Sequence, residues 1–293
     1  MRVSACITTR NRTRELDACL RALWNSHVKP HSVIVSDDSP DYEVQQKNHQ
    51  IVKEYPGTAY ITGPRSGVCA NRNHGLKAIP ASETDLVAFI DDDICVEPDF
   101  TAAAVARYSQ LPLEQQNCYI LSGVSQDGKG RESVPTKLSF RGYFCPTDVP
   151  QAVAIHAALF PRSFFEEEQW DENIFFGCED AELCLRALKR GYHILHCPEL
   201  RVRDTSIKST LATDGIGRLT NYEIHIEAAR LYVGVKRYKD LFPDPLKLVV
   251  FLSFYFVHMS VYLSKRGSLN ALPEIVRCSH LQTLWQQSRL KSA

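Results

Sequence analysis

Leu86-Val87-Ala88-Phe89-Ile90-Asp91-Asp92-Asp93 joins an unbroken apolar run to three consecutive carboxylates. Apolar runs of this kind are typical of parallel strands that are covered on both faces. In open α/β sheets ligands bind at the carboxyl ends of the strands, which is where these carboxylates lie. Three adjacent negative charges need a cation or several donors to stay ionised. The stretch therefore predicts a Mg²⁺ or Mn²⁺ site that holds a diphosphate, with a solvated acidic loop as the alternative.

A strand, a helix and a second strand are predicted at the start of the chain. Val3–Thr9 and Ser32–Asp38 have the composition of strands, and between them Leu16, Leu20 and Leu23 recur on one helical face. This βαβ unit, followed by further strands, is typical of an α/β domain with a mainly parallel sheet.

Polar residues also follow the next two predicted strands. The carboxylates of Asp37 and Asp38 can accept the ring N–H of a pyrimidine base or a ribose hydroxyl, or they can cap a turn. After the short strand Thr58–Thr62, a glycine-containing turn leads into a helix that carries Asn71 and Arg72. An Arg near a helix start suits an anion or a nucleotide, although a polar helix face is equally compatible.

The middle of the chain is predicted to extend the sheet. A helix to about Ser109 precedes a strand over Cys118–Val124. Ser125–Val149 is rich in Gly, Ser, Pro and charge, which predicts a loop over the site. Ala152–Phe160 is predicted to be a strand, in which we interpret His156 as a satisfied core residue.

A second acidic pair, Glu179-Asp180, begins a predicted helix that ends at Gly191. Acidic residues are favoured at helix N-termini by capping and by the helix dipole, so this pair has an ordinary structural explanation. The preceding Phe175 and Phe176 favour a functional one, because aromatic residues beside carboxylates can line a sugar pocket.

The composition excludes some classes of partner. Lys plus Arg equals Asp plus Glu at 34 each, which argues against nucleic acid as the main partner. The ten cysteines show no CxxC pair or zinc-like spacing, which is typical of a reducing compartment. Because the first residues form a strand rather than a secretory signal, we expect a cytoplasmic protein.

The C-terminal region, residues 211–293, is predicted to be a helical extension of the domain formed by residues 1–210. Tyr222–Tyr238 has an apolar side at helical spacing. Leu248–Ser264 is an uncharged run flanked by Lys247 and by Lys265-Arg266. Such a run fits a buried helix, a helix lying on a membrane surface or a short span. Basic and aromatic residues within 222–266 would allow peripheral contact with the inner face of a membrane.

Five motifs in order make the chain resemble glycosyltransferase family 2. The resemblance runs from about Val3 to Asp204. The motifs are Ile7-Thr-Thr-Arg-Asn-Arg12, Ser36-Asp-Asp-Ser39, Asn71-Arg-Asn-His-Gly-Leu76, Phe89-Ile-Asp-Asp-Asp93 followed by Pro98, and Trp170-Asp-Glu-Asn-Ile-Phe-Phe-Gly-Cys-Glu-Asp-Ala-Glu-Leu-Cys-Leu-Arg186 followed by Gly191.

This resemblance implies the GT-A fold, a Rossmann-like mixed and mainly parallel sheet flanked by helices. It also implies an inverting glycosyltransferase, which moves a sugar from a nucleoside diphosphate, here expected to be UDP, to a hydroxyl of a glycan or lipid-linked acceptor. Polysaccharide biosynthesis is the expected setting. Mn²⁺ or Mg²⁺ is the implied cofactor, because it neutralises the charge of the departing diphosphate.

The resemblance also implies roles for individual residues. Asp180 would be the general base, with Glu179 beside it in the catalytic pair. Asp93 would be the main metal ligand, and Asp91 would lie near the metal or the ribose. Asp37 would read the nucleobase and Arg72 would lie by the nucleotide. The remaining donor contacts are expected from Thr8, Arg10 and Asp92.

One position departs from the family pattern. Many members carry a His after the last core strand, where this chain has Asp204. The third metal ligand is therefore Asp204 or His196. The whole assignment requires Asp93 and Asp180 to face one small saccharide.

Two rival functions remain. A nucleotidyltransferase can share the sheet and the metal site, but a Gly-rich phosphate loop is expected after its first strand, and Thr8–Arg12 contains no glycine. A sugar- or nucleotide-binding module without turnover is the other rival, and the intact acidic pairs argue against it.

Overall fold

The computed structural model describes residues 1–205 and 215–291. Its centre is an eight-stranded mixed sheet among these described residues. Its strands, in spatial order, are β3 (Thr58–Thr62), β2 (Ser32–Asp37), β1 (Val3–Thr9), β4 (Leu86–Asp91), β9 (Ala158–Pro161), β6 (Tyr119–Gln126), β10 (His193–Asp204) and β5 (Ile94–Val96).

The N-terminal strands run parallel, so their carboxyl ends meet at one edge. Strand β1 pairs in parallel with both β2 and β4, and β2 pairs in parallel with β3. The register sets Thr8 opposite both Ser36 and Asp91. β9 enters antiparallel between β4 and β6, and β10 runs parallel to β6. The mixed, mainly parallel α/β sheet expected from the sequence is confirmed.

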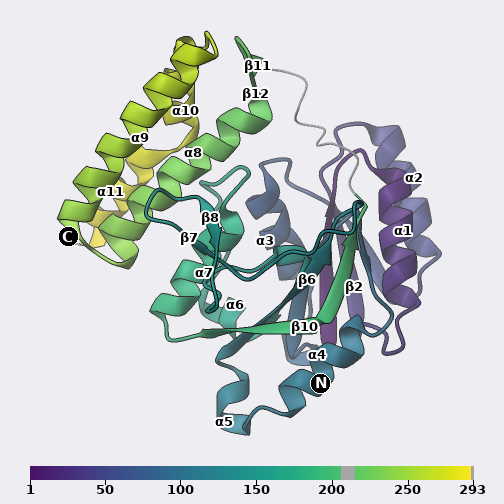
Figure 1. Cartoon of the computed structure of the whole chain (residues 1–293). Helices are drawn as coiled ribbons and strands as arrows, with labels where there is room; N and C mark the ends of the chain where they lie inside the picture. The colour runs from purple at the N-terminus through teal and green to yellow at the C-terminus, as the bar shows by residue number, and fades with distance from the viewer. Residues whose placement is uncertain (206–214, 292–293) are drawn as a thin grey trace.

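Helices cover both faces of the sheet (Figure 1). The α-helices of the described residues are α1 (Thr13–Trp24), α2 (Tyr42–Lys53), α3 (Val68–Ala78), α4 (Phe100–Ser109), α5 (Leu113–Gln116), α6 (Phe164–Glu167), α7 (Glu179–Lys189), α8 (Asn221–Lys236), α9 (Pro245–Lys265), α10 (Leu272–Cys278) and α11 (Leu281–Lys291).

Successive side chains of β1 point to opposite faces of the sheet, and they contribute to a separate apolar core on each face. Ala5 and Ile7 join the apolar cluster that contains Leu16 of α1, whereas Cys6 joins the cluster on the opposite face that contains Cys69 of α3. Because successive side chains of a strand point to opposite faces, one short strand supplies both cores.

The middle of the chain differs from the sequence-based interpretation in two places. Residues 125–149 are not wholly irregular, because β7 (Thr136–Leu138) and β8 (Phe144–Pro146) form a hairpin there. The predicted strand over Ala152–Phe160 is a 3₁₀ turn, Ile155–Ala157, followed by the shorter β9. His156 therefore lies in this turn and not in a strand.

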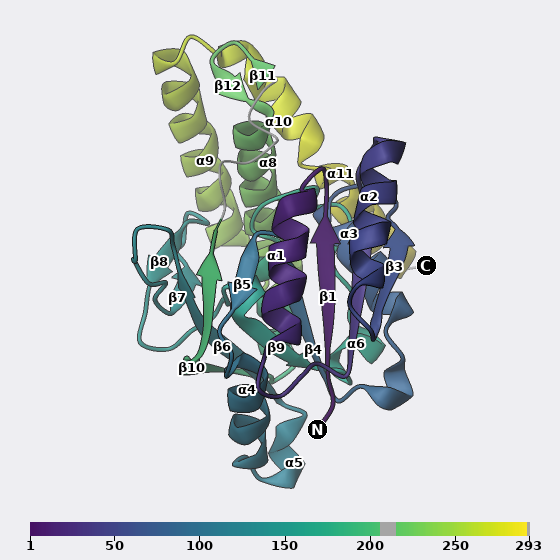
Figure 2. The same ribbon diagram turned by 90° about the vertical axis from the view of Figure 1, so that its right-hand side faces the viewer.

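The C-terminal helices form a group of their own, and Figure 2 shows α8, α9 and α10 beyond the carboxyl end of β1. A short hairpin, β11 (Gly215–Ile216) with β12 (Leu219–Thr220), leads into α8. The Phe251 ring of α9 packs so close to Gly234 of α8 that a Cβ at Gly234 would lie 2.1 Å from it. The predicted boundary between residues 210 and 211 lies outside the described residues.

By length and composition, helix α9 is long and apolar enough to cross a membrane. Only 22% of the 18-residue stretch that meets this test is buried in the protein. Its buried stripe contains Phe251, Tyr255 and Met259. Leu246 and Val257 lie on the exposed side, at 73% and 66% exposure. The helix therefore contributes one apolar stripe to the core and presents another outside it.

Candidate active site

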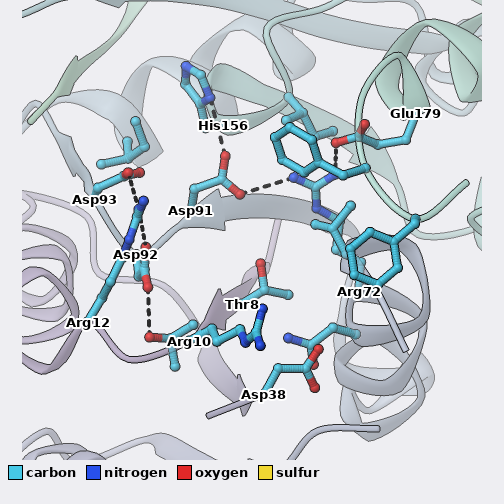
Figure 3. A pocket seen from close by; sticks show the side chains of 18 of the residues that line it. Thr8, Arg10, Arg12, Asp38, Arg72, Asp91, Asp92, Asp93, His156 and Glu179 are labelled. Atoms are coloured by element: carbon cyan, nitrogen blue, oxygen red, sulfur yellow. Dashed lines mark hydrogen bonds and ion pairs between the residues drawn. The ribbon is translucent and has the colours of Figure 1, made fainter. Parts of the chain in front are cut away.

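A cavity of about 560 Å³ opens at the carboxyl ends of β1, β4 and β10. The strand ends bring together side chains that are up to about two hundred positions apart in the sequence. Of the residues predicted to form the site, the cavity is lined by Thr8, Arg10, Arg72, Asp91, Asp92, Asp93, Glu179 and Asp204. Figure 3 shows most of them pointing toward one another.

Asp91 is held between two basic side chains at the end of β4. Its Oδ1 accepts a hydrogen bond from Arg72 at 3.0 Å, and its Oδ2 lies 3.6 Å from the Nδ1 atom of His156. Burial alone would raise the pKa of Asp91, but the charge of Arg72 and the nearby His156 outweigh it and hold the pKa well below its usual range. Asp91 is therefore a fixed negative charge in the cavity.

Arg72 connects the two acidic segments. Its guanidinium is bound to Asp91 and, at 3.0 Å, to Glu179, and it lies 4.8 Å from the centre of the Trp170 ring. Only 3% of the Arg72 side chain is exposed. A planar guanidinium suits this position because it can serve two carboxylates and an aromatic face at once.

We expect Arg72→Met to lower the free energy of unfolding by about 3 kcal/mol, because it leaves the buried Glu179 and the half-buried Asp91 without their shared cation. Urea unfolding at pH 7 measures this. The pKa of Asp91 is depressed in the folded state, so the stabilisation is present above the ordinary Asp pKa and is lost as the pH falls through the folded value.

Arg21→Met is the matched control, because Arg21 pairs with Asp17 on the surface and is 66% exposed. Its effect on the free energy of unfolding should be much smaller than that of Arg72→Met, because exposed ion pairs contribute little. Equal costs for the two variants would contradict the bridging role of Arg72.

Asp92 and Asp93 share Arg12. The guanidinium lies 3.1 Å from Oδ1 of Asp92 and also contacts Asp93, while Thr9 donates a hydrogen bond to Asp92 at 2.7 Å. Burial raises the pKa of Asp92 to about 7, and the Thr9 and Arg12 contacts only partly offset it. Burial, followed by the charge of Asp91 and with a further contribution from Asp204, raises the pKa of Asp93 in spite of Arg12.

The donor chemistry fits a hard divalent cation. Asp93 and Asp204 lie side by side, because Asp204 pairs with Ile94 and the Thr205 N–H donates to the Asp93 carbonyl at 2.9 Å. Their charges oppose each other, which an ion ligated by oxygen would relieve. Within residues 1–205 and 215–291, however, no three His, Cys, Asp or Glu side chains are gathered at metal-binding positions. His196 does not line the cavity, since it lies along β10 opposite Ser122.

Asp37 lies beneath the cavity rather than in it. It is fully buried, and its carboxylate accepts hydrogen bonds from the Ser39 N–H, Asn48 and Tyr60 at 2.8–2.9 Å. Its neighbour Asp38 does line the cavity and accepts a hydrogen bond from the Arg65 N–H at 2.8 Å.

Asp180 lies beside the cavity, but it does not line it. Glu179 faces the main cavity, whereas Asp180 lines a second cavity of about 180 Å³. Burial raises the pKa of Asp180, and the charge of Glu179 raises it further, while Arg72 and His156 oppose the shift. The expectation that Asp93 and Asp180 line a single cavity is therefore wrong, although Asp180 remains within the electrostatic influence of both basic residues.

Several cavity residues were missed in the sequence. His156 was interpreted as a core residue because Ala152–Phe160 has a strand-like composition, and no local signal marks the 3₁₀ turn. Tyr222 reaches the cavity from α8, so the C-terminal helices help to complete it. Arg65 could have been noticed as a basic residue in the turn before α3. Phe175 and Phe176 line the cavity as expected.

Comparisons with known proteins agree with this architecture. The sequence profile described as "Glycosyl transferase family 2" matches residues 4–168, which is more than half of the chain. A search of curated protein sequences finds no significant match. Among solved structures, S. aureus TarS superposes with a TM-score of 0.58 at 15% identity, covering 95% of this chain and 49% of that one.

A second solved structure, GalNAc-T7 with UDP, GalNAc and Mn²⁺, gives a TM-score of 0.61 at 15% identity and covers 92% of this chain and 58% of that one. The chain thus spans about half the length of these neighbours, and identities this low establish only the shared GT-A fold. The profile match establishes the family. The chain belongs to glycosyl transferase family 2.

Proposed function

We propose that this protein transfers a sugar from a nucleoside diphosphate, UDP in particular, to a hydroxyl of a glycan or lipid-linked acceptor, and inverts the anomeric carbon. The observation that carries the proposal is one cavity in which exposed cationic side chains face a buried acidic cluster at the strand ends. Cationic side chains are needed to bind a diphosphate, and carboxylates are needed to bind a divalent metal.

Arg10 and Arg65 are suited to bind the diphosphate. Both are exposed, both line the cavity, and neither guanidinium forms an ion pair with a described residue. Figure 3 shows Arg10 beside Thr8 and Asp38. The structures of TarS with UDP and with UDP-GlcNAc support a UDP-linked donor here.

Asp38 is better placed than Asp37 to contact the nucleobase. The carboxylate of Asp37 already accepts three hydrogen bonds and lies outside the cavity. Burial raises the pKa of Asp38, although the hydrogen bond from the Arg65 N–H and the charge of Arg10 oppose the shift. The nucleobase contact that the resemblance implies for Asp37 therefore passes to Asp38 in this proposal.

Asp93 and Asp204 would hold the Mn²⁺ or Mg²⁺ ion, with Asp91 nearby. When bound, such an ion neutralises the charge that develops on the departing diphosphate. Arg12 now pairs with Asp93, but Asp92 can retain it when Asp93 turns to a metal. The GalNAc-T7 structure with UDP and Mn²⁺ supports this part of the proposal.

Asp180 is the proposed general base. Because burial and the charge of Glu179 raise its pKa, its carboxylate binds a proton more readily than an ordinary Asp does. Glu179 is less suited to the role, since Arg72 neutralises it. Asp180 would remove the proton of the acceptor hydroxyl while that oxygen attacks the anomeric carbon.

A thermal-shift screen of sugar nucleotides tests the function as a whole. UDP-glucose, UDP-galactose, UDP-GlcNAc and UDP-GalNAc are compared with GDP-mannose, each with and without Mn²⁺. Binding to the folded state alone raises the melting temperature. We expect at least one UDP-sugar to stabilise the protein only when Mn²⁺ is present. No shift with any donor would contradict the proposal.

Helix α9 is proposed to rest on the cytoplasmic face of a membrane. Pro245–Lys265 contains no acidic residue, and Lys247, Lys265 and Arg266 lie at its two ends. Its exposed apolar stripe would enter the headgroup region while Lys265 contacts anionic lipids, since Lys247 pairs with Asp244 and Arg266 with Glu223. This arrangement would keep the cavity close to a lipid-linked acceptor.

We expect the double variant Val249→Glu and Val257→Glu to lose binding to phosphatidylglycerol vesicles by about tenfold or more, because two apolar contacts are replaced by charges that anionic lipids repel. Co-sedimentation measures the loss. Val28→Glu with Leu113→Glu, which changes two exposed apolar residues on other elements, is the matched control. Wild-type protein that binds no vesicles would remove the membrane contact from the proposal.

A further inference from the structure

A buried lysine at the end of α8 joins two segments that border the main cavity. Lys236, the last residue of α8, has its Nζ atom 2.5 Å from a carboxylate oxygen of Asp171 and 2.5 Å from one of Glu182. Its side chain is only 14% exposed. An ammonium group loses its hydration when it is buried, so it needs carboxylates beside it. We call these three residues the Lys236 cluster.

Asp171 is held in the cluster by more than one contact. Tyr232, one turn before Lys236 in α8, donates a hydrogen bond to the same oxygen of Asp171 at 2.7 Å. The backbone N–H and the side chain of Asn173 donate to its other oxygen at 3.0 and 2.7 Å. Burial would raise the pKa of Asp171, but the charge of Lys236 and these hydrogen bonds lower it to about 2. Asp171 therefore stays ionised and bound to α8.

Asp171 belongs to the segment that supports Arg72. The side chain of Asn73 donates to the carbonyl of the neighbouring Trp170 and accepts from its N–H, both at 2.9 Å. The Trp170 ring lies 4.8 Å from the Arg72 guanidinium. Arg72 in turn joins the two acidic segments of the cavity (Figure 3). A displacement of Asp171 would therefore move the ring against which Arg72 packs.

Glu182 connects the cluster to α7. Its side chain is 1% exposed, and Arg186 donates to its two oxygens at 2.7 and 2.8 Å. Glu179 and Asp180 begin the same helix, and Glu182 follows Glu179 by less than one helical turn. The contact between Lys236 and Glu182 therefore helps to fix the position of the acidic pair at the start of α7.

We propose that Lys236 is a positioning residue of the active site. By holding Asp171 and Glu182 at once, it fixes the separation between Arg72 and the acidic start of α7. Lys236 lies outside residues 4–168, which the family profile matches, and it lines neither cavity. It acts through its two partners, so the C-terminal helices help to arrange the site. As far as turnover is concerned, the inference rests on the proposed function.

The Trp170 ring reports on this arrangement, and ¹⁹F NMR of protein labelled with 5-fluorotryptophan measures it without any ligand. The chain contains three tryptophans, so Trp24→Phe and Trp285→Phe assign two resonances and leave the third to Trp170. Lys236→Met should shift the Trp170 resonance. Asp171→Asn should shift it too, and it keeps the test decisive if Lys236→Met does not fold. Lys236→Arg should restore the wild-type position, because a guanidinium can also serve two carboxylates.

Lys239→Met is the matched control. Lys239 follows Lys236 by three residues, is 15% exposed, and has its ammonium group 5.4 Å from the centre of the Trp285 ring. The control should shift the Trp285 resonance and leave that of Trp170 in place. The positioning role is overturned if the Trp170 resonance stays in place in both Lys236→Met and Asp171→Asn, or if Lys239→Met moves it equally.

Release of UDP from the donor that the thermal-shift screen identifies measures the effect on the reaction. Lys236→Met and Asp171→Asn should each lower kcat by about 10–100-fold, since a misplacement of about 1 Å can cost about 10²-fold. Both should keep the affinity for UDP with Mn²⁺, because Arg10 and Arg65 are unchanged. The double variant should lose no more than the worse single variant, since the two residues act as one unit.

Wild-type turnover in both single variants would also overturn the positioning role. So would a double variant whose loss is the product of the two single losses, because Lys236 and Asp171 would then act independently. A wild-type protein that binds no donor would instead contradict the proposed function. The ¹⁹F spectra would still decide whether Lys236 places Trp170.

Discussion

Asp93→Ala is expected to abolish the gain in UDP affinity that Mn²⁺ provides. Asp93 and Asp204 are the paired oxygen donors of the proposed metal site, and removing one leaves a single carboxylate. Changes even to residues behind a metal ligand commonly cost about 10–100-fold in metal affinity, so loss of a ligand should cost at least that much. Calorimetric titration of UDP with and without Mn²⁺ measures the difference.

The change should affect folding little, because Arg12 keeps its contact with Asp92 when Asp93 is removed. Asp148→Ala serves as the control, since Asp148 is exposed and lines neither cavity. If Asp93→Ala still bound UDP more tightly with Mn²⁺ than without it, the metal would have to be held elsewhere.

The strand ends of the site could be predicted from the sequence because local composition determines them. The apolar run before Asp91 and the strand at Val3–Thr9 each identify a carboxyl end, and parallel pairing brings such ends together. Asp204, by contrast, follows only from the family resemblance, as the residue at the position where many members carry a His. Most of the residues that line the main cavity could therefore be predicted from the positions of the strand ends.

Side-chain direction could not be predicted in the same way. Asp37 and Asp38 are adjacent in the sequence, yet one turns into the core to meet Asn48 and Tyr60 and the other faces the cavity. Glu179 and Asp180 likewise face different cavities. Which of two consecutive carboxylates points inward depends on distant partners such as Arg72, and no periodicity in the sequence records them.

The sequence also could not show which distant helices and hairpins contribute residues to the cavities. Tyr222 belongs to α8, after the region that resembles the family, but it packs against Phe176 at the cavity with ring centres 5.2 Å apart. The second cavity depends on the β7–β8 hairpin, whose strands are only three residues long each. Strands this short leave almost no alternation to detect.

We expect the rate to begin to fall, as the pH is lowered, at a pH above the ordinary pKa range of an Asp. Burial and the charge of Glu179 raise the pKa of Asp180. Below that pKa the carboxyl already holds a proton and cannot accept another, so kcat should fall as the pH falls through it. A profile that stays flat down to the usual Asp pKa would contradict a base with a raised pKa.

Asp180→Asn is expected to lower transfer by about 10²–10⁴-fold, the usual contribution of a general base, and to leave UDP binding unchanged. Asn has nearly the same shape but cannot accept the acceptor proton. Because the native pKa of Asp180 is raised, its ionised form costs stability at neutral pH, so the variant should unfold at the same temperature as wild type or higher. The unfolding temperature therefore distinguishes a variant that is inactive because it unfolds from one that is inactive because it lacks the base.

Glu179→Gln gives the decisive comparison, assayed with the donor that the thermal-shift screen identifies. Glu179 faces the main cavity but is neutralised by Arg72, so its variant should weaken that ion pair and keep the proton acceptor. If Glu179→Gln lost transfer by the larger factor while Asp180→Asn turned over normally, Glu179 would be the base. The acceptor hydroxyl would then have to approach from within the main cavity.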